Sequence, residues 1–294
     1  MTYTYSQLIK SLNDGQGHAL QELINNGLDP NAFITIPSHL SKSNRVHLLS
    51  LAIKAGGTCK PALNVLLKNG STPNFKGSTA WHNMAEKNLL GTLKFVSNFY
   101  PYQDTLNSNG LTPLQSFSLY GSRNDVQKKF EVFLWLLKNG ANPNVKDEEG
   151  NGIFTNLFNL KTSFIKNKSA WIKTALNFGL DPNFLGKNSQ SLLHEFGTLD
   201  KVVRVLLQGG ADPFLNDPTG IIALKNACNR DDLTAAKMLW EKGVSMDSDP
   251  SIWSSFGTFG GKMFLKWKVE WEQKNLNKIL SSPDITSTLK KIRL

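Results

Sequence analysis

The amino-acid sequence predicts an all-helical stack of repeated helix pairs, and two recurring phrases support this fold class. The phrase Leu-Leu-x-x-Gly-x-x-Pro-Asn occurs at residues 66–74 and 136–144, with variants at residues 23–31, 176–183, 206–213 and 239–247. A second phrase follows after a polar stretch, at residues 77–84, 110–117, 190–196 and 220–227. Self-similarity at intervals of about 20–50 residues indicates stacked repeats, because one helix pair cannot bury its apolar face alone.

The first phrase predicts the end of a helix and a turn. Its Leu-Leu pair places apolar side chains on the last helical turn, and the Gly that follows can adopt the left-handed conformation that ends a helix. Pro cannot continue a helix, and the nearby Asn or Asp can make local side-chain hydrogen bonds. Each copy therefore predicts a helix, a stop and a turn.

The second phrase predicts the start of the next helix. In residues 110–117, Thr112 is suited to cap a helix whose first position is Pro113. The apolar residues after Pro113 would then face the neighbouring repeat. A second helix in each repeat follows from this pattern.

Together the two phrases resemble the ankyrin repeat, a unit of about 33 residues whose first helix opens with Thr-Pro-Leu-His-x-Ala. Aligned on the Thr, the copies are spaced by 32, 33, 40, 39, 31 and 29 residues, at His47, Thr79, Thr112, Gly152, Ser191, Ile222 and Ser251. A further helix pair is expected between residues 5 and 26. The resemblance implies an ankyrin-repeat solenoid of seven or eight helix pairs with short hairpin-like turns over residues 1–261.

The copies depart from the family signature in two ways. The signature His is present at His82 and His194 and is replaced elsewhere, by Ser50, Gln115, Thr155, Lys225 and Ser254. The resemblance implies that this His joins successive turns by hydrogen bonds, so its loss should weaken local cooperativity. The longer copies between residues 112 and 190 imply inserted turns or extended helices, at residues 122–129 and 159–168.

Residues 262–294 lie outside the repeat pattern and are rich in basic side chains. Apolar residues at helical spacing predict a long closing helix, and Ser282 followed by Pro283 resembles the start of another. A repeat stack must cover its last apolar face, so we expect these helices to cap the array. The alternative is a basic amphipathic helix that docks on a membrane or an acidic partner.

The charge and the aromatic residues do not indicate a nucleic-acid-binding protein. The 294 residues include 33 Lys and Arg against 23 Asp and Glu, a formal charge of +10, which favours solubility and mild attraction to acidic partners. Before the C-terminal segment the Lys residues are spread along helices rather than gathered in a stripe. Four Trp residues fit the apolar pattern of the repeat helices, where a core role is expected, at Trp81, Trp135, Trp171 and Trp240.

Cysteine content and hydropathy predict the compartment. Only Cys59 and Cys228 are present, far apart in the sequence, so we expect small core residues in a reducing environment rather than a disulfide. The N-terminus lacks a basic start followed by a long apolar stretch, and the most apolar run, residues 133–137, is too short to span a bilayer. The expectation is a soluble, cytoplasmic protein, of the producing cell or of a host cell after export without a cleaved signal.

The sequence predicts no catalytic, cofactor or metal site. His82 and His194 are explained by the repeat signature, and the other three His residues lack nearby ligands or partners at a useful spacing. The glycines at residues 257–261 lack the Lys of a phosphate-binding loop. An enzyme with a site in residues 145–170 is a disfavoured alternative, because that segment contains neither His nor Cys.

The function that the repeats favour is non-catalytic binding to another protein, by a chain that is a monomer on its own. The binding edge is expected at the tips of the turns, at Phe75, Lys76, Asn107, Asn109, Lys146, Asp147, Glu148, Glu149, Leu185, Lys187, Leu215, Asn216 and Asp217. The degenerate signature resembles stand-alone ankyrin proteins of bacteria or their viruses. Two uses stay open: a host-directed effector, and an inhibitor or immunity protein for a cognate enzyme or toxin.

Overall fold

The computed structural model describes residues 4–14, 17–36, 45–54, 60–75, 79–122, 125–158, 165–199, 201–245 and 257–280. The chain forms two compact units. The first contains residues 1–166 and 177–180, and the second contains residues 167–176 and 181–294. The division that the sequence suggests, an array to residue 261 and a basic end from 262, stays a prediction.

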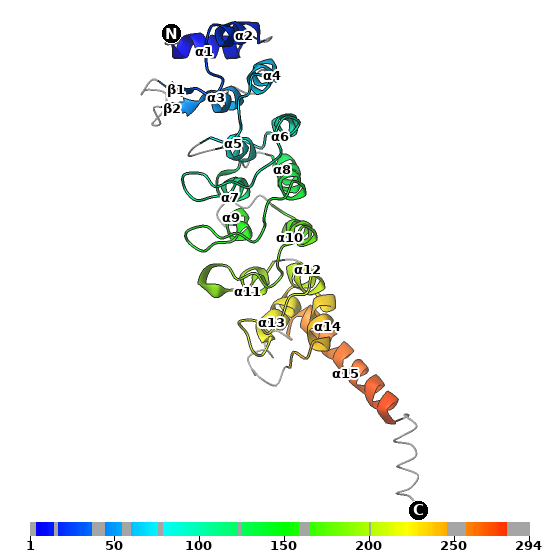
Figure 1. The fold of residues 1–294 in the computed structure, drawn as a ribbon. Coiled ribbons are helices and arrows are strands. Elements are labelled where there is room, and N and C mark those ends of the chain that lie inside the picture. Colours follow the sequence, from blue (N-terminus) through cyan, green and yellow to red (C-terminus); the bar gives the residue numbers. More distant parts are fainter. Residues whose placement is uncertain are drawn as a thin grey trace, which may run out of the picture. The chain divides into compact units, whose positions relative to one another are not determined.

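The first unit is built from helices in two layers (Figure 1). Its helices are α1 (Tyr5–Leu12), α2 (His18–Asn25), α3 (Leu48–Lys54), α4 (Lys60–Lys68), α5 (Ala80–Glu86), α6 (Leu90–Ser97), α7 (Pro113–Tyr120), α8 (Val126–Lys138) and α9 (Ile153–Leu157). Helices α3, α5, α7 and α9 contact one another in sequence and form the inner layer. In the outer layer α2 contacts α4 and α6 contacts α8.

A β-hairpin precedes α3. Strands β1 (Phe33–Thr35) and β2 (Arg45–His47) are antiparallel, with Phe33 opposite His47. Alternation of exposed and buried residues along β1 places Ile34 in the core. The hairpin is consistent with the expected hairpin-like turns between repeats.

The second unit continues the pattern of helix pairs. Its elements are α10 (Lys168–Asn177), a short 3-10 turn η2 (Lys187–Ser189), α11 (Leu192–Phe196), α12 (Val202–Gln208), α13 (Ile221–Asn229), α14 (Leu233–Glu241) and α15 (Phe259–Leu280). The last residue of α10, Asn177, is counted with the first unit. Helix α11 contacts α12 and α13, and α12 contacts α14. The structure thus confirms the predicted all-helical repeat architecture.

Most of the predicted helix starts are correct. Helices begin directly after five of the aligned positions, at His47, Thr79, Thr112, Gly152 and Ser191. The sixth position is wrong by two residues, because the residue that precedes α13 is Gly220, with a positive φ of 67°. A glycine adopts this conformation without the strain that a β-carbon would add. The last aligned position, Ser251, lies outside the described residues.

The Asn of the Pro-Asn pair joins one turn to the next. The amide nitrogen of Asn31 donates to the carbonyl of Gly70 at 3.1 Å, and its amide oxygen accepts the N–H of Thr72 at 2.9 Å. Asn144 donates in the same way to the carbonyl of Gly179 at 2.7 Å. One side chain therefore supplies hydrogen-bond partners to backbone groups of the following turn. These groups lie outside helices and so lack the usual helical partners.

The same link recurs in the second unit and in a turn without the Pro-Asn pair. In the second unit Asn183 accepts the N–H of Asp212 at 2.8 Å. In the first unit Asp104 accepts the N–H of Asn142 at 3.1 Å. We call these side-chain links between successive turns the turn clamps.

The local side-chain hydrogen bonds that the sequence predicted for the Asn or Asp near the Pro are made by Asp29 and Asp181. Each of these Asp residues lies two positions before the Asn of the Pro-Asn pair. The carboxylates of Asp29 and Asp181 accept the backbone N–H of Asn31 and Asn183, respectively, each at 2.8 Å. An Asx turn of this kind fixes the chain locally. The side-chain amide of the Asn therefore remains available for hydrogen bonds with the next repeat.

The signature His links repeats in one of its two copies. His82 lies with Nδ1 2.6 Å from the hydroxyl of Thr79 and Nε2 2.8 Å from the carbonyl of Leu111 in the next repeat. Burial lowers the pKa of His82, so the ring is neutral and Nε2 carries the proton donated to that carbonyl. His194 contacts Ser191 at 2.7 Å, but its buried Nε2 has no hydrogen-bond partner among the described residues.

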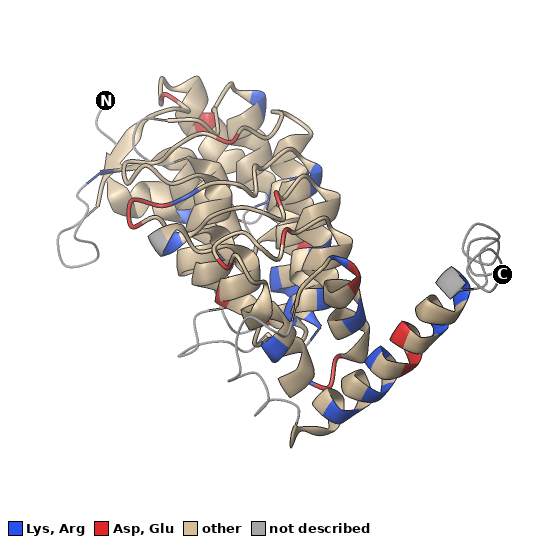
Figure 2. Ribbon diagram, turned by 90° about the horizontal axis from the view of Figure 1, so that it is seen from below, with Lys and Arg blue, Asp and Glu red and all other residues tan. Residues whose placement is uncertain are grey.

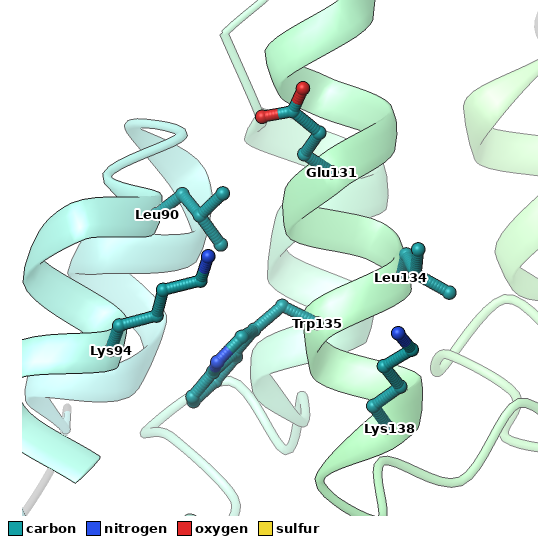
Figure 3. A pocket seen from close by; sticks show the side chains of 6 residues that line it. All are labelled: Leu90, Lys94, Glu131, Leu134, Trp135 and Lys138. Atoms are coloured by element: carbon teal, nitrogen blue, oxygen red, sulfur yellow. The ribbon is translucent and has the colours of Figure 1, made fainter. Parts of the chain in front are cut away.

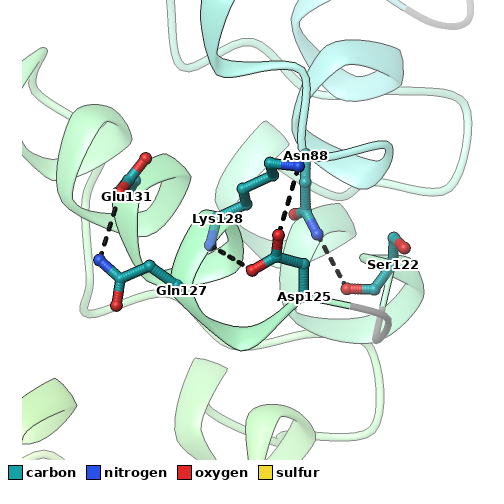
Figure 4. Close-up of polar contacts among 6 residues, drawn as sticks. All are labelled: Asn88, Ser122, Asp125, Gln127, Lys128 and Glu131. Carbon is teal, nitrogen blue, oxygen red and sulfur yellow. Dashed lines mark hydrogen bonds and ion pairs between the residues drawn. The ribbon is translucent and has the colours of Figure 1, made fainter.

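The predicted insertion at residues 122–129 lengthens a helix. Helix α8 has 13 residues, and Asp125 caps it by accepting the N–H of Lys128 at 3.0 Å. The amide of Asn88, just after α5, donates to the carbonyl of Ser122 at 2.9 Å and ties the insertion to the preceding repeat (Figure 4). The second predicted insertion, residues 159–168, falls partly outside the described residues.

Helix α15 covers the last helix pair. It contacts α13 and α14, and Phe264 is fully buried with its ring centroid 6.2 Å from that of Trp240. The far half of α15 extends beyond those helices (Figure 1), and Val269 and Leu276 are exposed. The long closing helix expected from the sequence is therefore present. The further helix expected from Ser282 lies outside the described residues.

We expect Asn31→Ala to lower the free energy of unfolding of the first unit by about 1–2 kcal/mol, because two backbone groups lose their partner. Urea unfolding followed by circular dichroism measures this loss. Asn109→Ala is the control, since its exposed side chain has no hydrogen bond to another described residue, and it should change stability by less than about 0.5 kcal/mol. Equal effects of the two substitutions would contradict a role for the clamp.

Phe264→Ala should destabilise the second unit by about 3 kcal/mol, because it removes a fully buried ring and leaves a cavity. Val269→Ala, on the exposed side of α15, should cost less than about 0.5 kcal/mol. Thermal unfolding of both variants measures the difference. A Phe264→Ala protein as stable as the parent would show that α15 does not cap the stack.

Candidate protein-binding surface

The turns of the first unit lie on one side, beyond the inner-layer helices (Figure 1). They are the strand residues 33–35 and 45–47 and the turn residues 71–75, 101–112 and 141–152. We call these described residues the finger surface. It contains seven of the thirteen residues predicted to bind a partner.

Asp147 holds the turn at residues 141–152 rather than facing solvent. Its carboxylate accepts the N–H of Asn151 at 2.8 Å, and the amide of Asn156 at 3.1 Å. Burial opposes ionisation of Asp147, but the hydrogen bonds from Asn156 and Asn151 outweigh it and hold its pKa below the usual value. Asp147 therefore stabilises the turn that presents Glu148 and Glu149, which are exposed.

Three further predicted residues also have structural contacts. Asn107 accepts the N–H of Leu111 at 3.1 Å and closes its own turn. Asp217 is buried and accepts the N–H of Ile222 at 2.8 Å. Asn216 accepts the N–H of Ser191 in the preceding turn at 3.0 Å. These side chains shape the turns of their own units.

The other predicted residues divide by exposure. Exposed polar side chains are those of Asn109, Lys146, Glu148, Glu149 and Lys187. Half-buried apolar side chains are those of Phe75, Leu185 and Leu215. Lys76 lies outside the described residues. Binding by any of them stays a prediction.

An aromatic cluster lies where the β1–β2 hairpin meets the turn at residues 71–75. Of its residues, the sequence prediction included only Phe75. The rings of His47 and Phe75 are stacked, with centroids 4.0 Å apart, and Phe33 meets His47 edge-on at 5.3 Å. The guanidinium of Arg45 lies 5.8 Å from the centroid of Phe33, which is 39% exposed. The signal was present, because Phe33 and Phe75 each stand one or two residues after a turn Asn.

His47 is held neutral inside this cluster. Its Nδ1 accepts the N–H of Leu49 at 3.3 Å, and the residue is only 2% exposed. Burial lowers the pKa of His47 to about 4, partly offset by the charge of Asp29. A neutral ring can stack on Phe75 without the cost of burying a charge.

The described residues do not form a cluster suited to chemistry. No group of three or more His, Cys, Asp or Glu among them converges to hold a metal ion. Cys228 is buried, and burial raises the pKa of its thiol to about 12, so the reactive thiolate is disfavoured. None of the described helices combines the length and apolarity needed to cross a membrane. In the described part of the chain, Lys and Arg occur on several helices (Figure 2).

Comparison with known proteins identifies the fold. No protein-family model and no curated protein matches the sequence. The crystal structure of the ankyrin repeat domain of Bcl-3, a unique member of the IkappaB protein family, is similar, with a TM-score of 0.56 and 22% sequence identity. The likeness covers 74% of this chain and 92% of that chain. The chain therefore has the ankyrin-repeat fold.

The stability of the first unit should fall as the pH is lowered from about 6.5 to about 4, in part through His47. The unfolded ring takes up a proton near pH 6.5, whereas the folded ring does so near 4, so acid favours the unfolded state. Across this range the unfolding free energy of the parent should fall by about 1–3 kcal/mol more than that of His47→Gln. Urea unfolding at several pH values measures both curves, and parallel curves would contradict the assignment.

Proposed function

We propose that this chain is a non-catalytic protein-binding module and that the finger surface contacts its partner. The observation that carries this proposal is the cluster of Phe33, Arg45, His47 and Phe75. Aromatic side chains and Arg are enriched in the centres of protein interfaces. A partly exposed aromatic ring beside a guanidinium is a suitable anchor for a partner.

The rest of the finger surface supports the same proposal. Glu148 and Glu149 stand exposed on a turn that Asp147 fixes from within. A rigid turn with exposed charges can supply the polar rim around an apolar anchor, and little entropy is lost when it binds. Stacked repeats present such turns side by side, which creates an extended binding surface.

Two biological uses fit this surface. A host-directed effector would bind a protein of another cell, whereas an inhibitor or immunity protein would bind an enzyme or toxin of the producing cell. An enzyme site in residues 145–170 is a less favoured alternative, because the polar residues described there hold the turn: Asp147 is bonded by Asn151 and Asn156.

Affinity purification of the tagged chain from the producing cell and from a host lysate tests the proposal. We expect one stoichiometric protein, and the lysate that yields it distinguishes the two uses. Phe33→Ala combined with Arg45→Glu should reduce recovery at least tenfold, equivalent to about 1.4 kcal/mol. Lys68→Glu, an exposed change on the outer layer, is the control and should leave recovery unchanged.

Two outcomes would contradict the proposal. One is equal recovery by the finger variant and the parent. The other is the absence of a stoichiometric partner from both lysates.

A further inference from the structure

A pocket lies between α6 and α8 of the first unit (Figure 3). These two outer-layer helices lie on the side opposite the turns of that unit (Figure 1). It has a volume of about 240 Å³. Two lining residues come from α6 and four from α8: Leu90 and Lys94, and Glu131, Leu134, Trp135 and Lys138. Helix α8 is the one that the predicted insertion lengthens.

The apolar part of the pocket is held rigid from behind. Trp135 is 9% exposed, and its ring stacks on Trp81 with centroids 6.2 Å apart. Tyr102 meets both rings edge-on, at 5.8 Å from Trp135 and 5.6 Å from Trp81. The phenol of Tyr102 donates to Asp104 at 2.8 Å, which fixes this third ring. A preorganised apolar wall lowers the entropy cost of binding.

The rim of the pocket carries basic side chains. Lys94 and Lys138 are exposed, and neither ammonium group has an ion-pair or hydrogen-bond partner in the part of the chain that the structure describes. The carboxylate of Glu131, by contrast, accepts the amide of Gln127 at 3.2 Å (Figure 4). The rim therefore favours a ligand with negative charge close to the apolar wall.

The size of the pocket limits its ligand. Sites for drug-sized molecules and cofactors usually measure about 300–1,000 Å³, so this pocket is small for them. Its volume suits one aromatic or large aliphatic side chain. Interfaces between proteins commonly bury single anchor residues of this kind in such pockets.

We propose that the α6–α8 pocket docks one aromatic or large aliphatic side chain of an acidic segment in a partner protein. The side chain packs against Leu90, Leu134 and Trp135, and flanking carboxylates pair with Lys94 and Lys138. This surface is separate from the finger surface and does not depend on it. It gives the chain a second point of contact on its outer layer.

A nucleic acid is the less favoured ligand, although a base stacked on Trp135 with phosphates on the two lysines has related chemistry. Binding to a nucleic-acid backbone requires several cations along a track, whereas this rim offers two. A single-stranded oligonucleotide therefore serves as a competing probe in the test.

Fluorescence anisotropy with a labelled ten-residue peptide tests the proposal. The peptide carries one Phe with two Asp on either side, and matched peptides carry Ala in place of Phe or Asn in place of each Asp. At low salt the parent chain should bind the first peptide about tenfold more tightly than either matched peptide.

Two variants identify the pocket as the binding site. Lys94→Glu with Lys138→Glu should weaken binding of the first peptide about tenfold, by reversing the rim charge. Leu90→Trp should weaken it as much by filling the pocket without a change of charge. The matched control is Lys68→Glu with Lys173→Glu, since Lys68 and Lys138 stand in identical Leu-Leu-Lys-Asn-Gly contexts. This control and the finger variant, Phe33→Ala with Arg45→Glu, should change binding less than about twofold.

Three results would overturn the proposal. One is equal binding of all three peptides, and another is equal weakening by the pocket variant and the matched lysine control. The third is tight binding of the oligonucleotide that the Lys94→Glu and Lys138→Glu variant abolishes. The peptide result does not depend on whether the finger variant changes partner recovery. The two proposals are therefore tested separately.

Discussion

The structure depends on the registration of each helix pair against the next, and the turn clamps make that registration specific. Apolar contacts between stacked helices supply most of the stability but are not directional. The amide of Asn31 bonds both a carbonyl and an N–H of the following turn, and Asn144 and Asn183 repeat part of this arrangement. One hydrogen-bonding side chain per turn thus fixes where successive repeats meet within each unit.

The clamps also explain the two proposed binding surfaces of the first unit. With the turns fixed, Phe33 and Phe75 from different repeats meet His47 at the finger base. On the other side, stacking of α6 against α8 brings Lys94 close to Trp135 and forms the pocket. Each surface requires residues from two repeats, so neither would exist in an isolated helix pair.

The sequence predicted the fold well because its signals are local. Gly, Pro and Thr at fixed spacing mark helix ends, and the structure begins helices directly after Thr79 and Thr112 as expected. The role of the signature His was also predictable, and His82 confirms it. At the corresponding position Gln115 closes a capping box with Thr112 instead, which keeps the helix start. Its side-chain nitrogen has no hydrogen-bond partner among the described residues, so it does not link this repeat to the next.

The proposed surfaces were harder to predict, because they depend on contacts between distant residues. The sequence treated Asp147 and Asp217 as candidates for binding, and only the folded turns show that these carboxylates accept backbone N–H groups. The α6–α8 pocket was not predicted either. Its lining residues are 37 or more positions apart between the two helices, and the apolar pattern gave Trp135 only a core role.

Hydrogen exchange at single backbone amides tests the central claim most directly. The N–H groups of Thr72 and Asp212 lie in turns outside helices. They donate to the side chains of Asn31 and Asn183, respectively, in the preceding turn. We expect both to exchange slowly in the native protein and to lose protection when Asn31 or Asn183, respectively, is replaced by Ala. Exchange at the rate of an unstructured peptide in the parent protein would contradict the account.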